Sequence, residues 1–562
     1  MEILIFIFPF LSFVVSFLPF SNKYLNIAFF INFIFMLLSF CLSVYLFIKL
    51  FQLNNDEPLY FYPLIQSNQN LLDWSLRLDL YVSVFLLVVT FVSLLVIINS
   101  VNIFKNSHLN LKLIRNLSLL TLGMLFIISS NNLIQFFISW QIIILSFYNL
   151  IKNVNSNYAI SNNSTIFMHN RLSDLGVFLS IYALFTLNNS IYFETIFDIN
   201  KFVKNNIVIL GINTNKAELA VLLLFFSLLL RFRQFFISNS IYDIKNINIP
   251  ILTSIFCSAI IPLTIFFIYR FFPLIYTSAN FLNIIITLSL CLALIFIYLS
   301  FKTTDIKFLI SYVVSSQACI IIYIFCLKEY HAAIFYFCSI SLSITMLYLC
   351  LGFVVFKLNN VSNVKDMGGL FFKMPAMFLF TLIAFFSISG IPFFSGYYSN
   401  QVIFSSLYFS QEALLIPSLL LGISFSFLIS YILLKNILLI FFGNNKGNIH
   451  QFNKVNDSSF INKFIFLCLG LCVVFAGWLT KNLFDGANAE YLWSLLIYND
   501  VSFSISAEVN SSENFKDLLI LFSLVGIFFA VVNYIIMPFI LNNYKLKYYK
   551  IFILYNKYFL RF

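Results

Sequence analysis

Charged residues are scarce in this chain of 562 residues: Asp, Glu, Lys and Arg make up 9% of it, whereas 61% is hydrophobic. A soluble fold of this length could not bury so much apolar surface, while a lipid bilayer supplies an apolar solvent for it. The scarcity of charge therefore excludes a soluble globular fold and indicates a polytopic integral membrane protein.

Cysteine and histidine occur without the spacing of a disulfide framework or a metal site. The nine cysteines all fall inside apolar runs, where we expect them to be small buried hydrophobes. The four histidines are scattered, so no metal or haem site is expected. A glycine-rich phosphate loop after a strand is also absent from the sequence, which predicts that this chain itself binds no NADH, flavin or iron–sulfur cluster.

Long apolar runs fill most of the chain instead. They are continuous over about 20 residues or more, which is typical of transmembrane helices and not of the alternating strands of a membrane barrel. The first run begins at Ile3 without an amphipathic leader or cleavage site, so we expect a mature span. About fifteen spans are predicted, at 3–20, 27–51, 79–103, 116–131, 133–151, 165–187, 217–237, 250–270, 279–301, 307–326, 331–356, 373–394, 412–441, 460–480 and 516–541.

Lysine and arginine predict the orientation of these spans, because loops on the inner side of a membrane carry an excess of basic residues. Basic residues concentrate in loops that follow odd-numbered spans, with Lys201 as an exception, whereas the loops 53–78 and 481–515 are acidic. We therefore expect the N terminus on the outer side and the C terminus on the inner side. The net charge of +11 follows from this topology and requires no nucleic-acid partner, while phospholipids are expected beside the basic loops.

The abundant residue types have AT-rich codons. The chain contains 75 Phe and 30 Tyr, with many Ile, Asn and Lys, against 15 Gly and 11 Pro. Together with the extreme hydrophobicity, this composition indicates an organelle-encoded protein, although an AT-rich bacterium would give the same pattern.

Gly390, Pro392 and Gly396 lie close together within an apolar run and predict an interruption of a helix. Proline lacks the N–H group that a helix needs, and glycine readily leaves helical backbone angles. An interrupted helix inside a bilayer exposes polar backbone to an ion pathway. A loop between two ordinary spans is the alternative interpretation.

Ionised groups inside the predicted spans are few, and each costs at least about 2.5 kcal/mol to insert. Arg171 and Asp174 are three residues apart, so they share a helix face and can pair. This pair either orients the start of its span or takes part in a proton relay. Arg231 either extends its side chain to the membrane interface or belongs to an ion pathway.

A series of motifs follows in an order and spacing that resemble one known family. They are Asn131–Gln141, His169–Gly176, the spaced residues Arg231, Gln234, Asp243, Pro250 and Arg270, then Asp305–Lys307 with Tyr312 and Gln317, His331–Phe335, Lys365–Leu370 and Ser389–Gly396. Over about residues 70–410 the chain resembles the subunit 5 family of NADH dehydrogenase, the distal antiporter-like membrane subunits of respiratory complex I, and its relatives in sodium/proton antiporters. Subunits 2 and 4 share the fold, but the motifs and the length favour subunit 5.

The resemblance implies an all-α, polytopic bundle of about 15 spans, with the antiporter-like fold, inverted repeats and broken seventh and twelfth helices. Its implied parts are residues 1–110 with spans 1–3, residues 111–270 and 271–441 as the two antiporter-like halves, and residues 442–562 with spans 14–15 and a basic tail. The family's lateral helix would then be lost or supplied by a separate polypeptide.

The resemblance also implies a function: a subunit of proton-translocating NADH:ubiquinone reductase in the mitochondrial inner membrane, with its N terminus on the intermembrane side and its C terminus on the matrix side. FMN, iron–sulfur clusters and ubiquinone would bind to other subunits. The neighbours would be other membrane-arm subunits, especially the subunit 4 homologue. A structural membrane-arm subunit without transport and a cation/proton antiporter subunit outside respiration are the alternatives.

The chain departs from the family at the positions that build the family's proton route. Those positions are held by Gln141 in the fifth span, Arg231 in the seventh, Phe256 in the eighth, Phe335 in the eleventh and Asn400 with Gln401 in the twelfth. Glutamine, asparagine and phenylalanine cannot exchange protons near neutral pH, and arginine stays protonated. We therefore hypothesise that this route is degraded or rerouted.

Arg171, Asp174, Arg231, Lys307 and His331 remain as candidates for proton transfer. Under the rival hypothesis the assumed helix alignment is wrong, and neighbouring groups such as Tyr269 and Tyr312 serve with Lys307 and His331.

Overall fold

The computed structural model describes most of the predicted spans. The described residues are 2–18, 24–53, 59–66, 71–104, 108–152, 159–188, 190–196, 206–209, 212–236, 261–276, 279–327, 329–409, 412–443, 452, 455–458, 460–484 and 513–537. The chain divides into two compact units, one formed by Met1–Thr287 with Tyr491–Ser502 and the other by Leu288–Glu490 with Phe503–Phe562.

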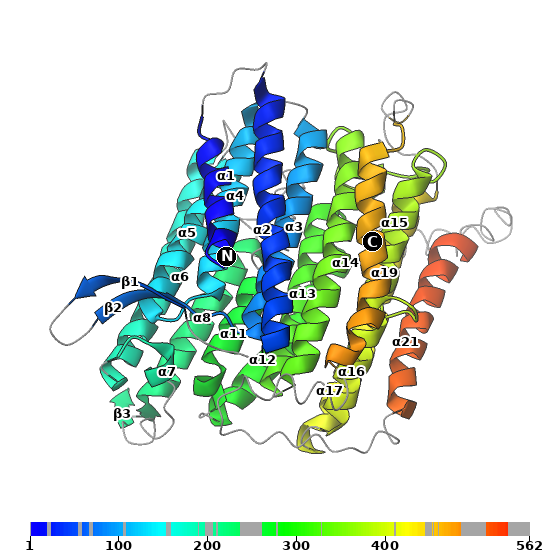
Figure 1. Ribbon diagram of the computed structural model, residues 1–562. Helices are drawn as coiled ribbons and strands as arrows, with labels where there is room; N and C mark the ends of the chain where they lie inside the picture. Colours follow the sequence, from blue (N-terminus) through cyan, green and yellow to red (C-terminus); the bar gives the residue numbers. More distant parts are fainter. Residues whose placement is uncertain are drawn as a thin grey trace. The chain divides into compact units, whose positions relative to one another are not determined.

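The first unit is a bundle of helices with two short β-hairpins (Figure 1). Its elements are α1 (Leu4–Val15), α2 (Leu25–Leu53), β1 (Leu59–Gln66), β2 (Leu71–Leu76), α3 (Leu80–Phe104), α4 (His108–Ile128), α5 (Leu133–Lys152), α6 (Ala159–Asn188), α7 (Phe193–Ile196), β3 (Asn206–Ile209), β4 (Ile212–Asn215), α8 (Lys216–Phe236) and α11 (Ile261–Tyr276). Helices that follow one another pack together, as α1 does with α2, α2 with α3 and α4 with α5, and α6 also packs on α8.

The two hairpins were not expected from the sequence, which predicted loops in both places. β1 pairs with β2 and β3 pairs with β4, both antiparallel. Aromatic and β-branched residues such as Tyr60, Phe61 and Ile65 favour extended backbone. The β1–β2 register shifts on both sides of Pro63, because proline has no N–H to donate to a strand ladder.

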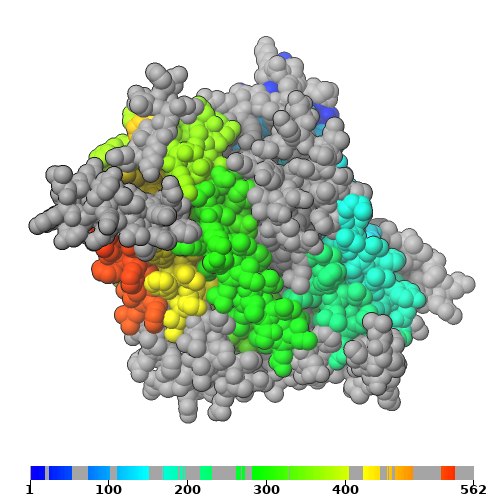
Figure 2. All heavy atoms as spheres, turned by 180° about the vertical axis from the view of Figure 1, so that it is seen from behind, coloured from blue at the N-terminus to red at the C-terminus, as the bar shows by residue number. Residues whose placement is uncertain are grey.

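The second unit is entirely helical in its described part. After α12 (Ala279–Lys302), which begins in the first unit, it contains α13 (Ile306–Cys326), α14 (Tyr330–Lys357), the 3₁₀-helix η4 (Val364–Asp366), α15 (Pro375–Ile388), α16 (Ser395–Phe409), α17 (Glu412–Phe441), α19 (Phe460–Phe484), α21 (Glu513–Val531) and the π-helix η6 (Val532–Ile536). α14 lies against α13, α15, α16 and α19. α17 lies beside α21, as the neighbouring yellow and orange-red regions in Figure 2 also show.

The lengths and apolar character of the helices confirm a polytopic membrane protein. Among the described residues, nine helices are long and apolar enough to cross a bilayer, and shorter apolar helices accompany them. Each of the predicted spans overlaps a described helix, although α4 begins at His108, earlier than expected. The seventh span, α8, is continuous from Lys216 to Phe236, and the break expected for this helix is not found within that range.

The break predicted at Gly390–Gly396 is present, between α15 and α16. α15 has 14 residues and is therefore about 21 Å long, too short to cross the hydrocarbon layer of about 30 Å by itself. Gly390 has φ 74° and Phe393 has φ 76°, both in the left-handed region. The freed Gly396 N–H donates to Ser387 Oγ at 3.3 Å, and the hydroxyls of Ser387 and Ser395 are 3.1 Å apart. The interruption thus supplies its own polar partners.

Gly396 permits the close approach of α16 to the end of α15. A Cβ atom at this position would overlap the carbonyl oxygen of Ser387. We expect Gly396→Ala to lower the free energy of unfolding by about 1–3 kcal/mol, since backbone would have to shift to admit the methyl group. The thermal unfolding of the purified chain in detergent, followed by circular dichroism, measures this effect.

Gly470→Ala is the matched control on α19. Its Cβ would meet Met346 Cε at 3.4 Å, which is ordinary contact, and alanine favours helix over glycine. Equal stability of the two variants would contradict the proposed steric role of Gly396.

Candidate functional site

Asp174 on α6 lies between a tryptophan and an arginine, both of which donate to it. Trp140 Nε1 on α5 donates to Asp174 Oδ1 at 3.1 Å, and Arg171 Nη1 donates to Asp174 Oδ2 at 3.1 Å. Asp174 is buried, whereas the Arg171 side chain is 47% exposed. The pair predicted from the sequence is therefore formed, and its carboxylate also fastens α6 to α5.

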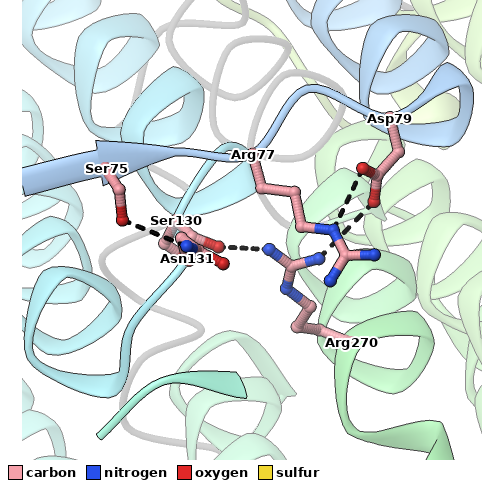
Figure 3. Close-up of polar contacts among 6 residues, drawn as sticks. All are labelled: Ser75, Arg77, Asp79, Ser130, Asn131 and Arg270. Atoms are coloured by element: carbon pink, nitrogen blue, oxygen red, sulfur yellow. Dashed lines mark hydrogen bonds and ion pairs between the residues drawn. The ribbon is translucent and has the colours of Figure 1, made fainter. Parts of the chain in front are cut away.

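A second charged cluster lies in the first unit where β2 leads into α3 (Figure 3). Asp79 Oδ1 accepts a hydrogen bond from Arg77 Nε at 3.0 Å, and Asp79 Oδ2 is 3.7 Å from Arg270 Nη1. Asp79 is 2% exposed and Arg270 is 4% exposed. We call these residues the Arg77–Asp79–Arg270 cluster.

Arg270 connects this cluster to the link between α4 and α5. Its guanidinium donates to the carbonyl of Ser130 and lies 4.9 Å from the ring centroid of Phe193. The backbone N–H of Arg77 donates to the carbonyl oxygen of Ser129 in the same link, at 2.9 Å. Asn131 Nδ2 in turn donates to Ser75 Oγ at 3.1 Å. Backbone polar groups at a helix end are thereby paired inside the protein.

The chemistry of the Arg77–Asp79–Arg270 cluster is structural. Arginine stays protonated, so two permanent cations face one buried carboxylate and neither can release a proton. Arg77 and Asp79 were not expected to be functional residues from the sequence, and Arg270 was named there only as one residue of a spaced motif. The sequence signal for this cluster is the pair of opposite charges, Arg77 and Asp79, two residues apart at the start of a predicted span.

In the second unit, Phe335 fills the position that the resemblance assigns to a lysine. It is 1% exposed, and its ring stacks on Phe484 of α19 with centroids 5.1 Å apart. Asn400, another replacing residue, packs its side chain against Gly390 at the helix break. Gln401 and Gln141 are both partly exposed.

Neutral polar side chains near Phe335 connect α14 to its neighbours. Tyr336 OH donates to Gln317 Oε1 of α13. One turn further along α14, Ser339 Oγ lies 2.7 Å from Ser399 Oγ of α16, just after the helix break. These groups can carry hydrogen bonds, but hydroxyls and amides hold no charge near neutral pH.

The structure does not bring the remaining candidates together. Lys307 is buried at the start of α13 and His331 at the start of α14, and the two antiparallel helices place them at opposite ends. Arg231 is on α8, but its side chain, like Phe256 as a whole, lies outside the described residues. Among the described residues, no group of three or more His, Cys, Asp or Glu could hold a metal ion.

Two titratable residues of the second unit escaped the sequence analysis. Glu329 lies in the link between α13 and α14, and burial raises its pKa to about 7. Lys435 on α17 is 3% exposed. Lys435 is an isolated lysine within the apolar run of a predicted span, so the sequence alone could have indicated it as a candidate site residue.

These features define an antiporter-like polytopic membrane protein with an interrupted helix. A family model described as NADH:quinone oxidoreductase/Mrp antiporter, TM matches residues 130–426. The chain belongs to this family.

Relatives and solved structures are similar over most of the chain. NADH-ubiquinone oxidoreductase chain 5 of Acanthamoeba castellanii is 25% identical over 500 residues, which are 87% of this chain and 71% of the relative. The protein of that name in Chondrus crispus is 27% identical over 475 residues, 83% of this chain and 71% of the relative.

Two solved structures share the fold. One chain of the Mrp complex from Dietzia sp. DQ12-45-1b has a TM-score of 0.75 and 14% identity, with 94% of this chain and 56% of that chain covered. A chain of the archaeal membrane-bound sulfane sulfur reductase has a TM-score of 0.66 and 20% identity, with 85% and 76% covered. This chain therefore spans little more than half the length of the Mrp chain.

Removal of the Asp79 carboxylate should unfold the first unit more readily. We expect Asp79→Asn to cost about 3–5 kcal/mol, because Arg77 and Arg270 lose the buried carboxylate that they share. Asp457→Asn is the control, since Asp457 pairs with Lys463 at 2.9 Å at a half-exposed site, where about 0–1 kcal/mol is expected. Thermal unfolding in detergent compares the two, and equal losses would contradict the structural role of the cluster.

Glu329 should make stability fall as pH rises. Its pKa is about 7 when folded, against an ordinary value of 4.5, so the folded chain binds more protons than the unfolded chain between these two pH values. The stabilising contribution is full below about pH 4.5 and is lost as pH rises through 7. We expect the thermal unfolding midpoint of Glu329→Gln to depend less on pH between 5 and 8 than that of the wild type. Parallel plots of midpoint against pH for the two proteins would contradict this assignment.

Proposed function

We propose that this chain is a subunit-5-type membrane-arm subunit of respiratory complex I in the mitochondrial inner membrane. The family match and the relatives named NADH-ubiquinone oxidoreductase chain 5 support complex I. The composition supports an organelle-encoded, inner-membrane location. In this assignment the redox cofactors FMN and iron–sulfur clusters, and ubiquinone, bind to other subunits.

We further propose that the proton route of the family is degraded at its own positions in this chain. The observation that carries this proposal is the stacked pair of Phe335 and Phe484, which fills a buried place with two apolar rings. A phenyl ring cannot take up a proton, and rings in contact leave no room for water between them. The use of Asn400 to pack the helix break supports the same conclusion.

Arg171, Asp174, Lys307, His331 and Arg231 would then act mainly in structure. Asp174 supports this assignment, because its two oxygens each accept from a fixed donor, Trp140 or Arg171. Both carboxylate oxygens are thus engaged in hydrogen bonds, one of which joins α6 to α5.

An Mrp-type cation/proton antiporter subunit is the second candidate function. The TM-score of 0.75 to the Mrp chain favours it as a fold, and nothing in that likeness specifies the ion. The neighbours separate the two candidates: complex I subunits, among them the subunit 4 homologue, or the subunits of an antiporter. Phospholipids beside the basic loops are further proposed partners.

Purification of the tagged chain in mild detergent tests the assignment. We expect flavin, iron–sulfur signals and NADH oxidation to accompany the chain, because the redox subunits of complex I would remain attached. Purification with antiporter subunits and without redox cofactors would contradict it.

Asp174→Asn tests the degraded route in the same assembled complex. We expect the number of protons moved per electron, measured in sealed vesicles, to stay at the wild-type value, since a route already interrupted loses nothing. Trp140→Phe, which removes the other donor to Asp174, is the matched structural control. A lower ratio in Asp174→Asn alone would show a working relay.

A further inference from the structure

Lys435 is a buried lysine that forms no ion pair with any residue in the described part of the chain. It lies on α17, six residues before the helix ends at Phe441, and is 3% exposed. Its ammonium makes no ion pair within 4.0 Å among the residues that the structure describes, in contrast to Arg77, Arg171 and Arg270.

Two aromatic rings take the place of a carboxylate around this lysine. Lys435 Nζ lies 4.5 Å from the ring centroid of Phe301 on α12 and 5.9 Å from that of Tyr534 on η6. Cation–π contacts stabilise an ammonium less than its burial without a counter-charge costs. Such a lysine can exist as the neutral amine, which arginine cannot do.

The helix that supplies Tyr534 is itself unusual. η6 is a π-helix of five residues, Val532–Ile536, directly after α21. Single π-turns in α-helices are rare and frequently occur at functional sites. Asn533 Nδ2 donates to Tyr431 OH of α17 at 3.3 Å, so this turn is fixed to the helix that carries Lys435.

A short path leads from Lys435 to an exposed helix end. Lys435 is about 9 Å from the end of α17. Phe301, which contacts it, is next to Lys302, the exposed last residue of α12. Lys435 is therefore buried within reach of the surface at one end of the second unit.

The described parts of the elements that face α17 carry few titratable and charged groups. They are Tyr534 on η6, Tyr298 and Lys302 on α12, Lys365 and Asp366 in η4, and Tyr397 and Tyr398 on α16, besides Tyr431 on α17 itself. η4, which carries Lys365 and Asp366, packs against α17. α15 contains no titratable residue.

The charged residues of α21 lie far from Lys435. Ser430 and Gly526 approach each other, as do Tyr431 and Asn533 further along, so α17 and α21 run parallel. Glu513, Lys516 and Asp517 begin α21, whereas Tyr534 follows its end. About 17 residues of helix therefore separate these charges from the lysine, roughly 26 Å.

We propose that Lys435 is a proton-exchanging residue of the second unit, which takes up a proton from one end of the unit as its amine and releases it again as its ammonium. The inference rests on the proposed function and deepens it. The family's route is lost at its own positions, and protons are exchanged at Lys435 instead. The step forms and breaks one N–H bond, and water supplies and receives the proton.

Two variants test this in the assembled complex, reconstituted in sealed vesicles. Lys435→Arg keeps the charge and the ring contacts but cannot release a proton, while Lys435→Met keeps the length of the side chain and removes the charge. We expect both to retain NADH oxidation within about twofold of the wild type and to lower the number of protons moved per electron. Lys435→Met also serves as the folding control, because an apolar side chain suits the buried site.

Lys357→Arg is the matched control. Lys357 also ends near a ring, with Nζ 5.4 Å from the centroid of Phe353, but it is only partly buried at the end of α14. The control should leave the ratio unchanged at every pH between 6 and 8.5. A loss confined to Lys435→Arg and Lys435→Met supports proton exchange.

A wild-type ratio in Lys435→Arg would overturn this inference, since it would show that the lysine is only a cation between two rings. That result would leave the proposed function intact as long as the redox subunits accompany the chain. Purification of the chain without redox subunits would overturn the proposed function and this inference together.

Discussion

The pairing of polar groups inside an apolar medium is the constraint on which this structure depends. Hydrocarbon offers no hydrogen bonds, so every N–H, carbonyl and charge at membrane depth needs a partner from the protein. The helix break between α15 and α16 shows how this is met. The hydroxyls of Ser387 and Ser395 lie beside the freed backbone, and Gly396 allows the two helix ends to approach closely enough to use them.

The same constraint separates two kinds of charged residue. Three arginines of the first unit are paired with carboxylates: Arg171 with Asp174, and Arg77 and Arg270 with Asp79. These pairs tie α5 to α6 and join β2, α11 and the α4–α5 link, and their charge is permanent. Lys435 in the second unit has aromatic rings in place of a carboxylate. A lysine ammonium becomes neutral when it loses one proton. The pairing pattern thus distinguishes the arginines held in ion pairs from the lysine that we propose to exchange protons.

Packing also explains two residues at positions that the resemblance assigns to the family's proton route. Phe335 is stacked on Phe484, and Asn400 supports the turn at Gly390, so both residues stabilise the bundle at places where a titratable group would need water. The hydrogen bond between Tyr336 and Gln317 and the contact of Ser339 with Ser399 keep α14 joined to α13 and α16. These contacts would keep the antiporter-like fold packed under the proposal that the acid–base residues of the family are replaced in this chain.

The sequence by itself determined the membrane class, the positions of the spans, the break at Gly390–Gly396 and the pairing of Arg171 with Asp174. Hydrophobic runs, glycine with proline, and a three-residue spacing are local signals, and each acts within one helix. Only the tertiary structure decided that Arg270 meets Asp79, that Phe335 stacks on Phe484 and that Lys435 lies between Phe301 and Tyr534. These contacts join residues far apart in the chain, so their partners depend on how helices pack, which no local pattern encodes.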